Sequence, residues 1–490
     1  MWAALASHVN ADPATTTDSG VAWYQGDVAG AFKVAQSSHK PVLLYWGAKW
    51  CPPCQQLKSF VFTRKDFIEK SKQFVSVYLD GDNPGAQKWG ERFHVSGYPT
   101  VVILGPDQSE ITRMSGGMDL SLYADLLDAA LSDAKPLRDV LATLRKNPAA
   151  LSASDCRRLA YYSWDAGHFL IPDPKELAAD LEIAASKCQT LNPTERARLT
   201  VNSAALSSTP ERARQVMAIV EDRTLAPHVL DVLEDLQESF FTAVQSQEAS
   251  AATQFEVNWI WTMDQAANDP AVVDADQLYA IGAKLVALKR FAADKKVPRD
   301  VAAEARARVS TALAKSVDPY VRSGIVNSAS YIYDALDDKE AMYQMLMAEV
   351  NTAKTPFYYM VDLGQLEEER GNRQEALAWY EKAYRESTGT ATRFEWGYDY
   401  LAALVRLVPT EHERIRKVGL EVIAELDGPD RIHARARGRL EKLDAALRKW
   451  DAERRYDRDI AALHAYMQNI CAKLQTKDSG RGTCQRFLST

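Results

Sequence analysis

Residues 41–54, which read PVLLYWGAKWCPPC, decide the fold of the N-terminal part. The run begins with a short apolar stretch, which is typical of a buried β-strand. Two cysteines follow with two residues between them, Cys51 and Cys54, and apolar residues continue at helical spacing through Leu57 and Phe60. The stretch therefore predicts a strand that ends just before a Cys-x-x-Cys motif, and a helix that begins at the motif.

The first cysteine of the motif lies where a helix begins, and this position favours a thiolate. Unpaired N–H groups and the positive end of the helix dipole point at the Cys51 sulfur. Pro52 and Pro53 preset φ and carry no N–H, so the amide of Cys54 is the donor left to face that sulfur. Such sites lower a cysteine pKa from about 8.5 to roughly 3.5–7.5. We expect Cys51 to be ionised and solvent-facing, with Cys54 shielded behind it. Lys49 is a further source of positive charge or simply a solvated side chain.

A second element lies at residues 96–100, which read SGYPT and lead into a predicted strand. The peptide bond before a proline can be cis at a cost of only about 0.5–1 kcal/mol. A cis Pro99 beside the dithiol leaves the Tyr98 backbone free to pair with an extended peptide. Trp50 and Tyr98 flank the sulfur and are predicted to form a contact surface, with simple packing as the alternative.

The first quarter of the chain alternates between helical and strand patterns, which indicates an α/β domain with a sheet covered on both faces. The predicted strands are 41–46, 74–79, 100–104 and 110–114, and the predicted helices are 26–36, the helix opened by the cysteines, 86–93 and 119–131. This set of elements fits one domain.

Together these pieces resemble the thioredoxin superfamily over about residues 20–135. The Trp-Cys-x-x-Cys after a strand, the Gly-Tyr-Pro-Thr loop and the turn at Gly116 and Gly117 follow thioredoxin order. The loop is similar to protein disulfide isomerase domains. Residues 23–54 resemble the thioredoxin-like domains of periplasmic disulfide-reducing proteins. The resemblance implies a thioredoxin fold and a site shaped in part by Gly116.

The resemblance also implies roles for individual residues. Cys51 is expected to be the attacking nucleophile, Cys54 the resolving thiol and Pro99 the cis proline. One position departs from the pattern: thioredoxins usually carry a buried aspartate where Tyr45 stands here, and that aspartate helps to deprotonate the second cysteine. Base-assisted resolution and the redox direction therefore stay open.

The C-terminal part, residues 136–490, has almost no strand-like alternation and is predicted to be all-α. Residues 357–390 resemble a tetratricopeptide (TPR) repeat with Gly371 at the turn, and a third helical pair is predicted at 392–426 with Trp396 packed inward. The positions that match the repeat are Leu363, Gly364, Gly371, Ala376, Tyr380 and Ala383. Stacked helical pairs create concave surfaces, so a protein partner on this domain and a passive scaffold both stay open.

Composition excludes several classes of function. The 490 residues carry 59 basic and 66 acidic side chains, so no overall basic field attracts nucleic acid. No apolar run is long enough to span a bilayer. The arginines of residues 431–458 alternate with acidic residues and are predicted to form a solvated, ion-paired helix face. No metal or organic cofactor is implied.

The four other cysteines fall into two local pairs, Cys156 with Cys188 and Cys471 with Cys484. In an exported protein they suit two structural disulfides, whereas in a reducing cytosol they are buried small hydrophobes. Residues 1–20 are interpreted as the remnant of an export signal or a linker, because Val9-Asn10-Ala11 has the form of a cleavage site. We expect a periplasmic protein, with the cytoplasm as the alternative.

These observations predict a thioredoxin-fold domain at 21–135 that acts as a thiol–disulfide oxidoreductase and reduces disulfides in protein substrates. Its electrons are expected to come from an unidentified dithiol protein. A zinc site is the rival interpretation of the motif, but the sequence holds no second CxxC or CxxH. Two other functions stay open: a helical-repeat adaptor or chaperone-like binding protein with a regulatory dithiol, and a disulfide isomerase.

Overall fold

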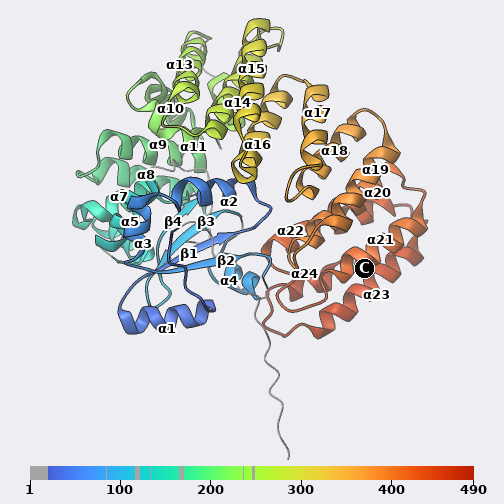
Figure 1. Cartoon of the computed structure of the whole chain (residues 1–490). Coiled ribbons are helices and arrows are strands. Elements are labelled where there is room, and N and C mark those ends of the chain that lie inside the picture. Colours follow the sequence, from blue (N-terminus) through green and yellow to red (C-terminus); the bar gives the residue numbers. More distant parts are fainter. Residues whose placement is uncertain are drawn as a thin grey trace, which may run out of the picture.

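The computed structural model describes residues 20–83, 85–95, 97–115, 122–132, 134–164, 170–234, 237–245 and 249–489. An α/β domain begins the chain, and a long helical region follows it (Figure 1). Apart from Gly20, the predicted export-signal remnant lies outside the described residues. Among the helices in the described ranges, none combines the length and the apolar character that crossing a bilayer requires.

The sheet of the α/β domain has four strands in the order β2-β1-β3-β4. β1 pairs in parallel with β2 and antiparallel with β3, which pairs antiparallel with β4. Every residue of β1 is buried, because helices cover both faces of the sheet, and this is why the strand reads as a continuous apolar run. The strands are β1 Val42–Gly47, β2 Val75–Asp80, β3 Thr100–Leu104 and β4 Glu110–Ser115.

Alternate residues of the strands point to opposite faces. Leu44 and Trp46 face α1 and α4, whereas Leu43 and Tyr45 face α3 and α5. The predicted α/β domain, with a sheet covered by helices on both faces, is confirmed. The helices are α1 Val28–Ser38, α2 Pro52–Gln56 with a π-helical turn at Leu57–Val61, α3 Lys65–Ser71, α4 Ala86–Arg92 and α5 Tyr123–Ser132.

Helix α3 is the one element of this domain that the sequence did not predict. It has seven residues, and Phe67 is its only buried apolar side chain. A helix that short repeats no apolar position at helical spacing, so no periodicity marked it.

The sheet and the first helices of the helical region share one core. Arg158 of α7 is fully buried, donates a hydrogen bond to the carbonyl of Ile111 in β4 at 3.1 Å, and pairs with Asp155 at 2.7 Å. Leu137 and Val140 of α6 pack into the same core. The sheet therefore has helices from both parts of the chain on one of its faces.

All described secondary structure beyond α5 is helical. Four helices begin in the same way, with an Asp, Asn or Thr N-cap followed by proline at the first position, and each N-cap side chain accepts a hydrogen bond from the first turn. The helices are α6 Leu137–Lys146, α7 Ala153–Tyr161, α8 Pro174–Lys187, α9 Pro193–Leu206, α10 Pro210–Glu221, α11 Leu230–Glu234, α12 Gln237–Gln245, α13 Ala249–Asn268, α14 Asp274–Phe291, α15 Arg299–Lys315, α16 Pro319–Ala335, α17 Lys339–Val350, α18 Phe357–Glu369, α19 Arg373–Glu386, α20 Arg393–Leu407, α21 His412–Ala424, α22 Ala434–Trp450, α23 Asp457–Lys473 and α24 Arg481–Arg486.

The segment that resembles a TPR repeat forms the hairpin of α18 and α19. Gly371 at its turn has a φ of +81°, a conformation that favours glycine. A Cβ at Gly364 would lie 3.0 Å from the Tyr380 ring, so a glycine there lets the two helices approach closely. The predicted third pair is also present, as α20 and α21.

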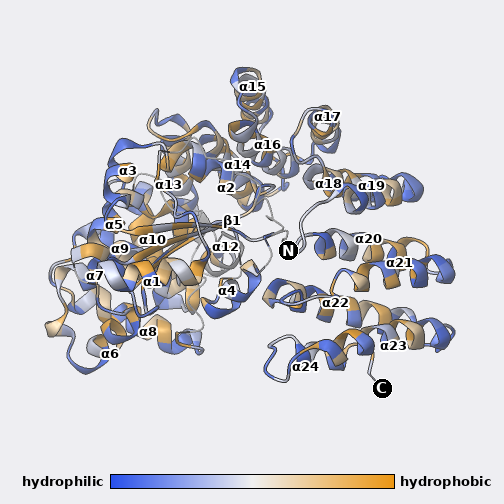
Figure 2. Cartoon of the chain, turned by 60° about the horizontal axis from the view of Figure 1, so that its bottom comes forward, coloured by the Kyte–Doolittle hydropathy of each residue, from blue (hydrophilic) through white to orange (hydrophobic). Residues whose placement is uncertain are grey.

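The helical region curves away from the sheet and then returns to it, so that α22 lies beside α4 (Figure 1). Hydrophobic residues gather on the strands and along one side of many helices (Figure 2). One apolar core runs from α9 to α18 and a second from α18 to α24. The C-terminal helices, α18 to α24, therefore form an arm that packs against itself and reaches the α/β domain.

Candidate active site

The two cysteines of the motif lie between the end of β1 and the first turn of α2. Cys51 is the N-cap of α2, in extended conformation, and Pro52 and Pro53 occupy the first helical positions. The amide of Cys54 points at the Cys51 sulfur, with a distance of 3.2 Å between N and Sγ. This is the arrangement that favours an anion on the first cysteine once the sulfur is reduced.

Cys51 and Cys54 form a disulfide, with Cα atoms 5.2 Å apart. The structure therefore shows the oxidised form of the dithiol. Among the described residues, no group of three or more histidine, cysteine or acidic side chains is arranged to hold a metal ion.

The dithiol is buried: Cys51 is 3% exposed and Cys54 is 0% exposed. The expectation that Cys51 faces solvent is therefore wrong for this structure. Its sulfur packs among Ala48, Trp50 and Tyr98, and the last two are themselves covered by the arm. The sequence pattern describes the loop alone and gives no sign that distant helices lie on top of it.

The Tyr98–Pro99 peptide bond is cis. Tyr98 packs against the dithiol, and its hydroxyl is 2.9 Å from the side-chain amide nitrogen of Gln87 in α4. Burial raises the pKa of Tyr98, so its hydroxyl stays protonated at neutral pH. Gly116 and Gly117, which the resemblance places near the site, lie outside the described residues, as does Ser96.

Tyr45 stands behind the dithiol at the position where thioredoxins usually have an aspartate. Its hydroxyl donates to the carbonyl oxygen of Cys54 at 3.2 Å, and its ring stacks on Tyr78 with centroids 5.2 Å apart. Burial raises the pKa of Tyr45 well above its usual value, so the group beside Cys54 is a neutral phenol. Lys49 is exposed, and the carbonyl oxygen of that residue accepts a hydrogen bond from Gln55 at 2.6 Å.

Trp50 connects the dithiol loop to the arm. Its indole N–H is 3.1 Å from a carboxylate oxygen of Asp82 and 3.0 Å from the hydroxyl of Thr392. Its ring lies 6.2 Å from that of Tyr358 and 5.9 Å from that of Trp396, measured between centroids. Asp82 also accepts hydrogen bonds from the amide and the hydroxyl of Thr392. Trp50, which was predicted to form a contact surface, thus contacts helices of the same chain.

Two arginines of α22 face the α/β domain. Arg435 lies over the rings of Trp50 and Tyr98, and Arg437 pairs with Glu91 of α4 at 2.8 Å. The prediction of a solvated arginine face is therefore wrong at these two positions. The alternation of Arg with Asp and Glu is the same whether such a side chain meets water or another domain, so the sequence could not separate the two cases.

Sequence reasoning missed the arm residues that meet the loop, namely Tyr358, Thr392 and Arg435, and it missed Asp82 of the α/β domain, which binds Thr392. Trp396 was predicted to pack inward, which was the one available signal. Its partner, Trp50, is far away in the sequence, and nothing local identifies it.

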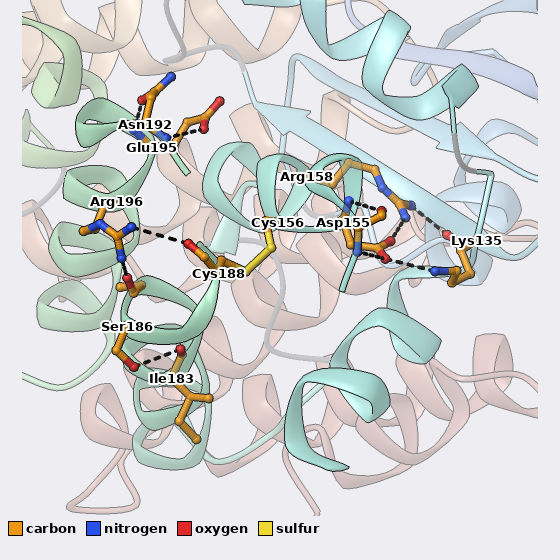
Figure 3. The surroundings of a disulfide bond; sticks show 12 residues. Lys135, Asp155, Cys156, Arg158, Ile183, Ser186, Cys188, Asn192, Glu195 and Arg196 are labelled. Carbon is orange, nitrogen blue, oxygen red and sulfur yellow. Dashed lines mark hydrogen bonds and ion pairs between the residues drawn. A yellow bond between two sulfur atoms is a disulfide. The ribbon is translucent and has the colours of Figure 1, made fainter. Parts of the chain in front are cut away.

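The other four cysteines form two disulfides, Cys156–Cys188 and Cys471–Cys484. The first joins α7 to the end of α8 (Figure 3). Beside it, Asp155 accepts from Lys135 at 2.9 Å and from the buried Arg158. The second joins α23 to α24. The first lies in the core that the sheet shares with the helices after it, and the second lies in the core of the arm.

Comparisons with known proteins agree with this geometry. Residues 28–131 match the thioredoxin-like domain family. The chain is similar to the thiol:disulfide interchange protein DsbD of Pseudomonas fluorescens, with 30% identity over 123 residues, which are 24% of this chain and 20% of that protein. It is also similar to DsbD of Actinobacillus pleuropneumoniae, with 27% identity over 100 residues, which are 20% of this chain and 17% of that protein.

The chain thus spans about a fifth of the length of these relatives. The domain match and the Cys51–Cys54 disulfide support thiol–disulfide oxidoreductase activity. The N-terminal part of the chain is a domain of the thioredoxin superfamily, and a helical region follows it.

Proposed function

We propose that this chain is a thiol–disulfide oxidoreductase that reduces disulfides in protein substrates through Cys51 and Cys54. The observation that carries the proposal is the Cys51–Cys54 disulfide at the start of α2, beside the cis peptide bond of Pro99. In our proposal residues 21–135 form the redox domain, and residues 136–490 form the helical domain.

The proposed cycle begins with the reduced dithiol. The Cys51 thiolate attacks one sulfur of a substrate disulfide, forms a mixed disulfide and releases the other substrate sulfur as a thiolate. Cys54 then loses its proton and attacks the Cys51 sulfur, which releases the second substrate thiolate and leaves the Cys51–Cys54 disulfide. Two electrons have passed to the substrate. A dithiol protein then reduces the disulfide by the same exchange in reverse.

The neighbouring residues have supporting roles in this proposal. Pro52 and Pro53 shape the first turn, Pro99 keeps the Tyr98 backbone beside the sulfur, and Trp50 lies next to the incoming substrate. By the thioredoxin resemblance, Gly116 is also proposed to border the site. A protein substrate can reach Cys51 only when the arm moves off Trp50, because Cys51 is 3% exposed.

We propose that the protein works in an oxidising compartment such as the periplasm. Cys156–Cys188 and Cys471–Cys484 are both buried and bonded, and disulfides of this kind persist where thiols are not kept reduced.

A turnover assay tests the proposal: reduction of a disulfide-bonded protein such as insulin, with dithiothreitol as electron source. Cys51→Ser is expected to abolish turnover, and Cys54→Ser is expected to accumulate a mixed disulfide that survives non-reducing gel electrophoresis. Cys471→Ser combined with Cys484→Ser is the matched control and is expected to keep turnover. Full activity in both single variants would reject the mechanism.

One observation favours a second candidate, a binding protein in which the dithiol regulates the helical domain: the arm covers the dithiol. That function predicts a bound partner without turnover. The assay above separates the two candidates.

A further inference from the structure

The guanidinium group of Arg435 lies over the rings of Trp50 and Tyr98, the two aromatic residues that pack against the dithiol. It is 4.5 Å from the ring centroid of Tyr98 and 5.6 Å from that of Trp50. Both residues pack against the small cluster formed by Ala48, Cys51 and Cys54. The side chain of Arg435 is 17% exposed, so its charge is largely shielded from solvent. A residue of the helical region thus brings a positive charge into the dithiol site.

The carboxylates of Glu395 and Asp82 both act on that charge. Glu395 of α20 pairs with Arg435 at 2.7 Å, but the same carboxylate oxygen also pairs with Arg439 at 3.0 Å. Two guanidinium groups therefore share one buried carboxylate. Other ionisable groups lie nearby. Asp82 after β2, Tyr98 before β3 and His433 at the start of α22 interact with Arg435, and Tyr358 of α18 stacks on Trp50. Asp362 of α18 acts on Tyr358, and Asp399 of α20 lies near Glu395 and Arg439, whereas Lys49 is exposed.

A buried thiolate needs such a charge. Reduction of the disulfide adds two electrons and two protons, and Cys51 becomes nucleophilic only when it releases its proton to solvent. Burial opposes this release, because an anion is less stable away from water. The Cys54 amide supplies one hydrogen bond at 3.2 Å, and Lys49 is exposed. In the described part of the site, Arg435 is the shielded cation that stacks on the rings around the sulfur.

We propose that Arg435 is a positioning residue of the dithiol, which stabilises the Cys51 thiolate from the helical region and so makes the active site a joint product of both parts of the chain. This inference rests on the proposed function and adds the source of the thiolate's stability. It assigns the arm a chemical role besides covering the site.

A purely mechanical role for Arg435 is the competing explanation, and the chain offers a matched control. Arg437 lies two residues further along α22 and also crosses to the α/β domain, where it pairs with Glu91. Arg437→Gln weakens the same contact between arm and domain but leaves the charge over Tyr98 and Trp50 in place.

The test measures the rate of Cys51 alkylation by iodoacetamide in the reduced full-length protein as a function of pH, with Cys51 quantified by mass spectrometry. Each variant is made in a His433→Gln background, which removes the titration of His433 from the opening of α22. Movement of the arm then scales the rate at every pH, whereas the midpoint of the pH profile reports the thiolate. Arg435→Gln is expected to raise the midpoint by about half a pH unit or more, since an opposite charge nearby favours the ionised form. Arg435→Lys is expected to restore most of the shift, and Arg437→Gln is expected to leave the midpoint in place.

A variant that is expected to shift the midpoint in the opposite direction separates the proposed effect from misfolding. Glu395→Gln removes the negative charge beside Arg435 and is expected to lower the midpoint, whereas structural damage would move both variants in one direction. An unchanged midpoint in Arg435→Gln, an equal shift in Arg437→Gln, or a raised midpoint in Glu395→Gln overturns the inference. The midpoint does not depend on turnover. A protein that fails to reduce insulin yet shows these shifts would refute the proposed function and keep the role of Arg435.

Discussion

The dithiol and the two disulfides of the helical region are about equally buried, but they lie in different surroundings. Cys156–Cys188 and Cys471–Cys484 each join two helices inside one core, with sequence separations of 32 and 13 between the partners. Cys51–Cys54 has a separation of 3 and lies where the α/β domain meets the arm. Burial alone therefore does not distinguish a structural disulfide from a reactive one. The distinguishing feature is whether the atoms around the sulfur can separate without unfolding a core.

The largest expected effect separates the two kinds of disulfide directly. Removing Cys156–Cys188 with two serines is expected to lower the free energy of unfolding by about 3–4 kcal/mol, because a long closed loop restricts the unfolded chain. Turnover below the melting temperature should persist. Cys51→Ser should do the opposite, with turnover lost and stability nearly unchanged. Urea denaturation measures the stability of both proteins, and the insulin assay measures their turnover. A loss of turnover in the folded Cys156→Ser, Cys188→Ser protein contradicts the comparison.

The second prediction is that acid loosens α22, the helix that places Arg435 over the dithiol loop, and leaves the disulfide-bonded cores intact. His433 begins α22 and is 4% exposed. Burial first, and then the nearby Arg435 and Arg437, lower the pKa of His433 to about 3. In the unfolded state His433 is protonated below its usual pKa of about 6.5, whereas in the folded state it stays neutral down to about pH 3. The free energy of unfolding therefore falls as the pH falls from about 6.5 toward 3.

At pH 5 this difference amounts to about 2 kcal/mol, or roughly thirtyfold more frequent opening of α22. Hydrogen exchange of the α22 amides at pH 7 and pH 5, corrected for intrinsic rates, measures it. His433→Gln should flatten the pH dependence, and the amides of α8, which is tied by Cys156–Cys188, serve as the control. Equal loosening of α8 and α22 would show that His433 is not the cause.

The contrast between the two regions also explains what the sequence could predict. The strand, the cysteines and the helix that follows are contiguous in residues 41–54, so their chemistry and their local geometry are encoded together. The hairpin of α18 and α19 is equally local, with Gly371 at its turn. Patterns within one segment were sufficient for these elements.

The contacts between the arm and the dithiol loop have no local signature. Trp50 and Thr392 are 342 residues apart, and Glu91 and Arg437 are 346 apart. Inward packing of Trp396 follows from its position on a helix, but the identity of its partner does not. The exposure of Cys51 was mispredicted for the same reason, since a loop that looks open in its own domain is closed by a distant part of the chain.

A third prediction tests whether the arm can move away from the dithiol loop. Asp82 holds the arm by accepting hydrogen bonds from Trp50 and Thr392. Asp82→Ala is expected to weaken closure by about 1.5 kcal/mol, the lower end of what a hydrogen bond to a charged group contributes. Iodoacetamide should then modify reduced Cys51 about tenfold faster at a fixed pH. Asp107→Ala, in an exposed turn after β3 where the carboxylate accepts hydrogen bonds from Ser109, is the control. An unchanged alkylation rate in Asp82→Ala would mean that the arm does not limit access.

The smallest expected effect lies behind the dithiol, at Tyr45. Tyr45→Phe removes the hydrogen bond from the hydroxyl to the Cys54 carbonyl, which contributes about 0.5–1.5 kcal/mol, but it removes no base, because burial keeps this phenol neutral. Resolution of a mixed disulfide by Cys54, followed by stopped-flow fluorescence, should slow by less than about tenfold. Tyr78→Phe removes a hydroxyl from the adjacent stacked ring and is the control. A loss of about a hundredfold or more in Tyr45→Phe alone would mean that the phenol takes the proton from Cys54. The environment behind the dithiol would then be part of the chemistry, whereas the cores around the other two disulfides serve only for packing.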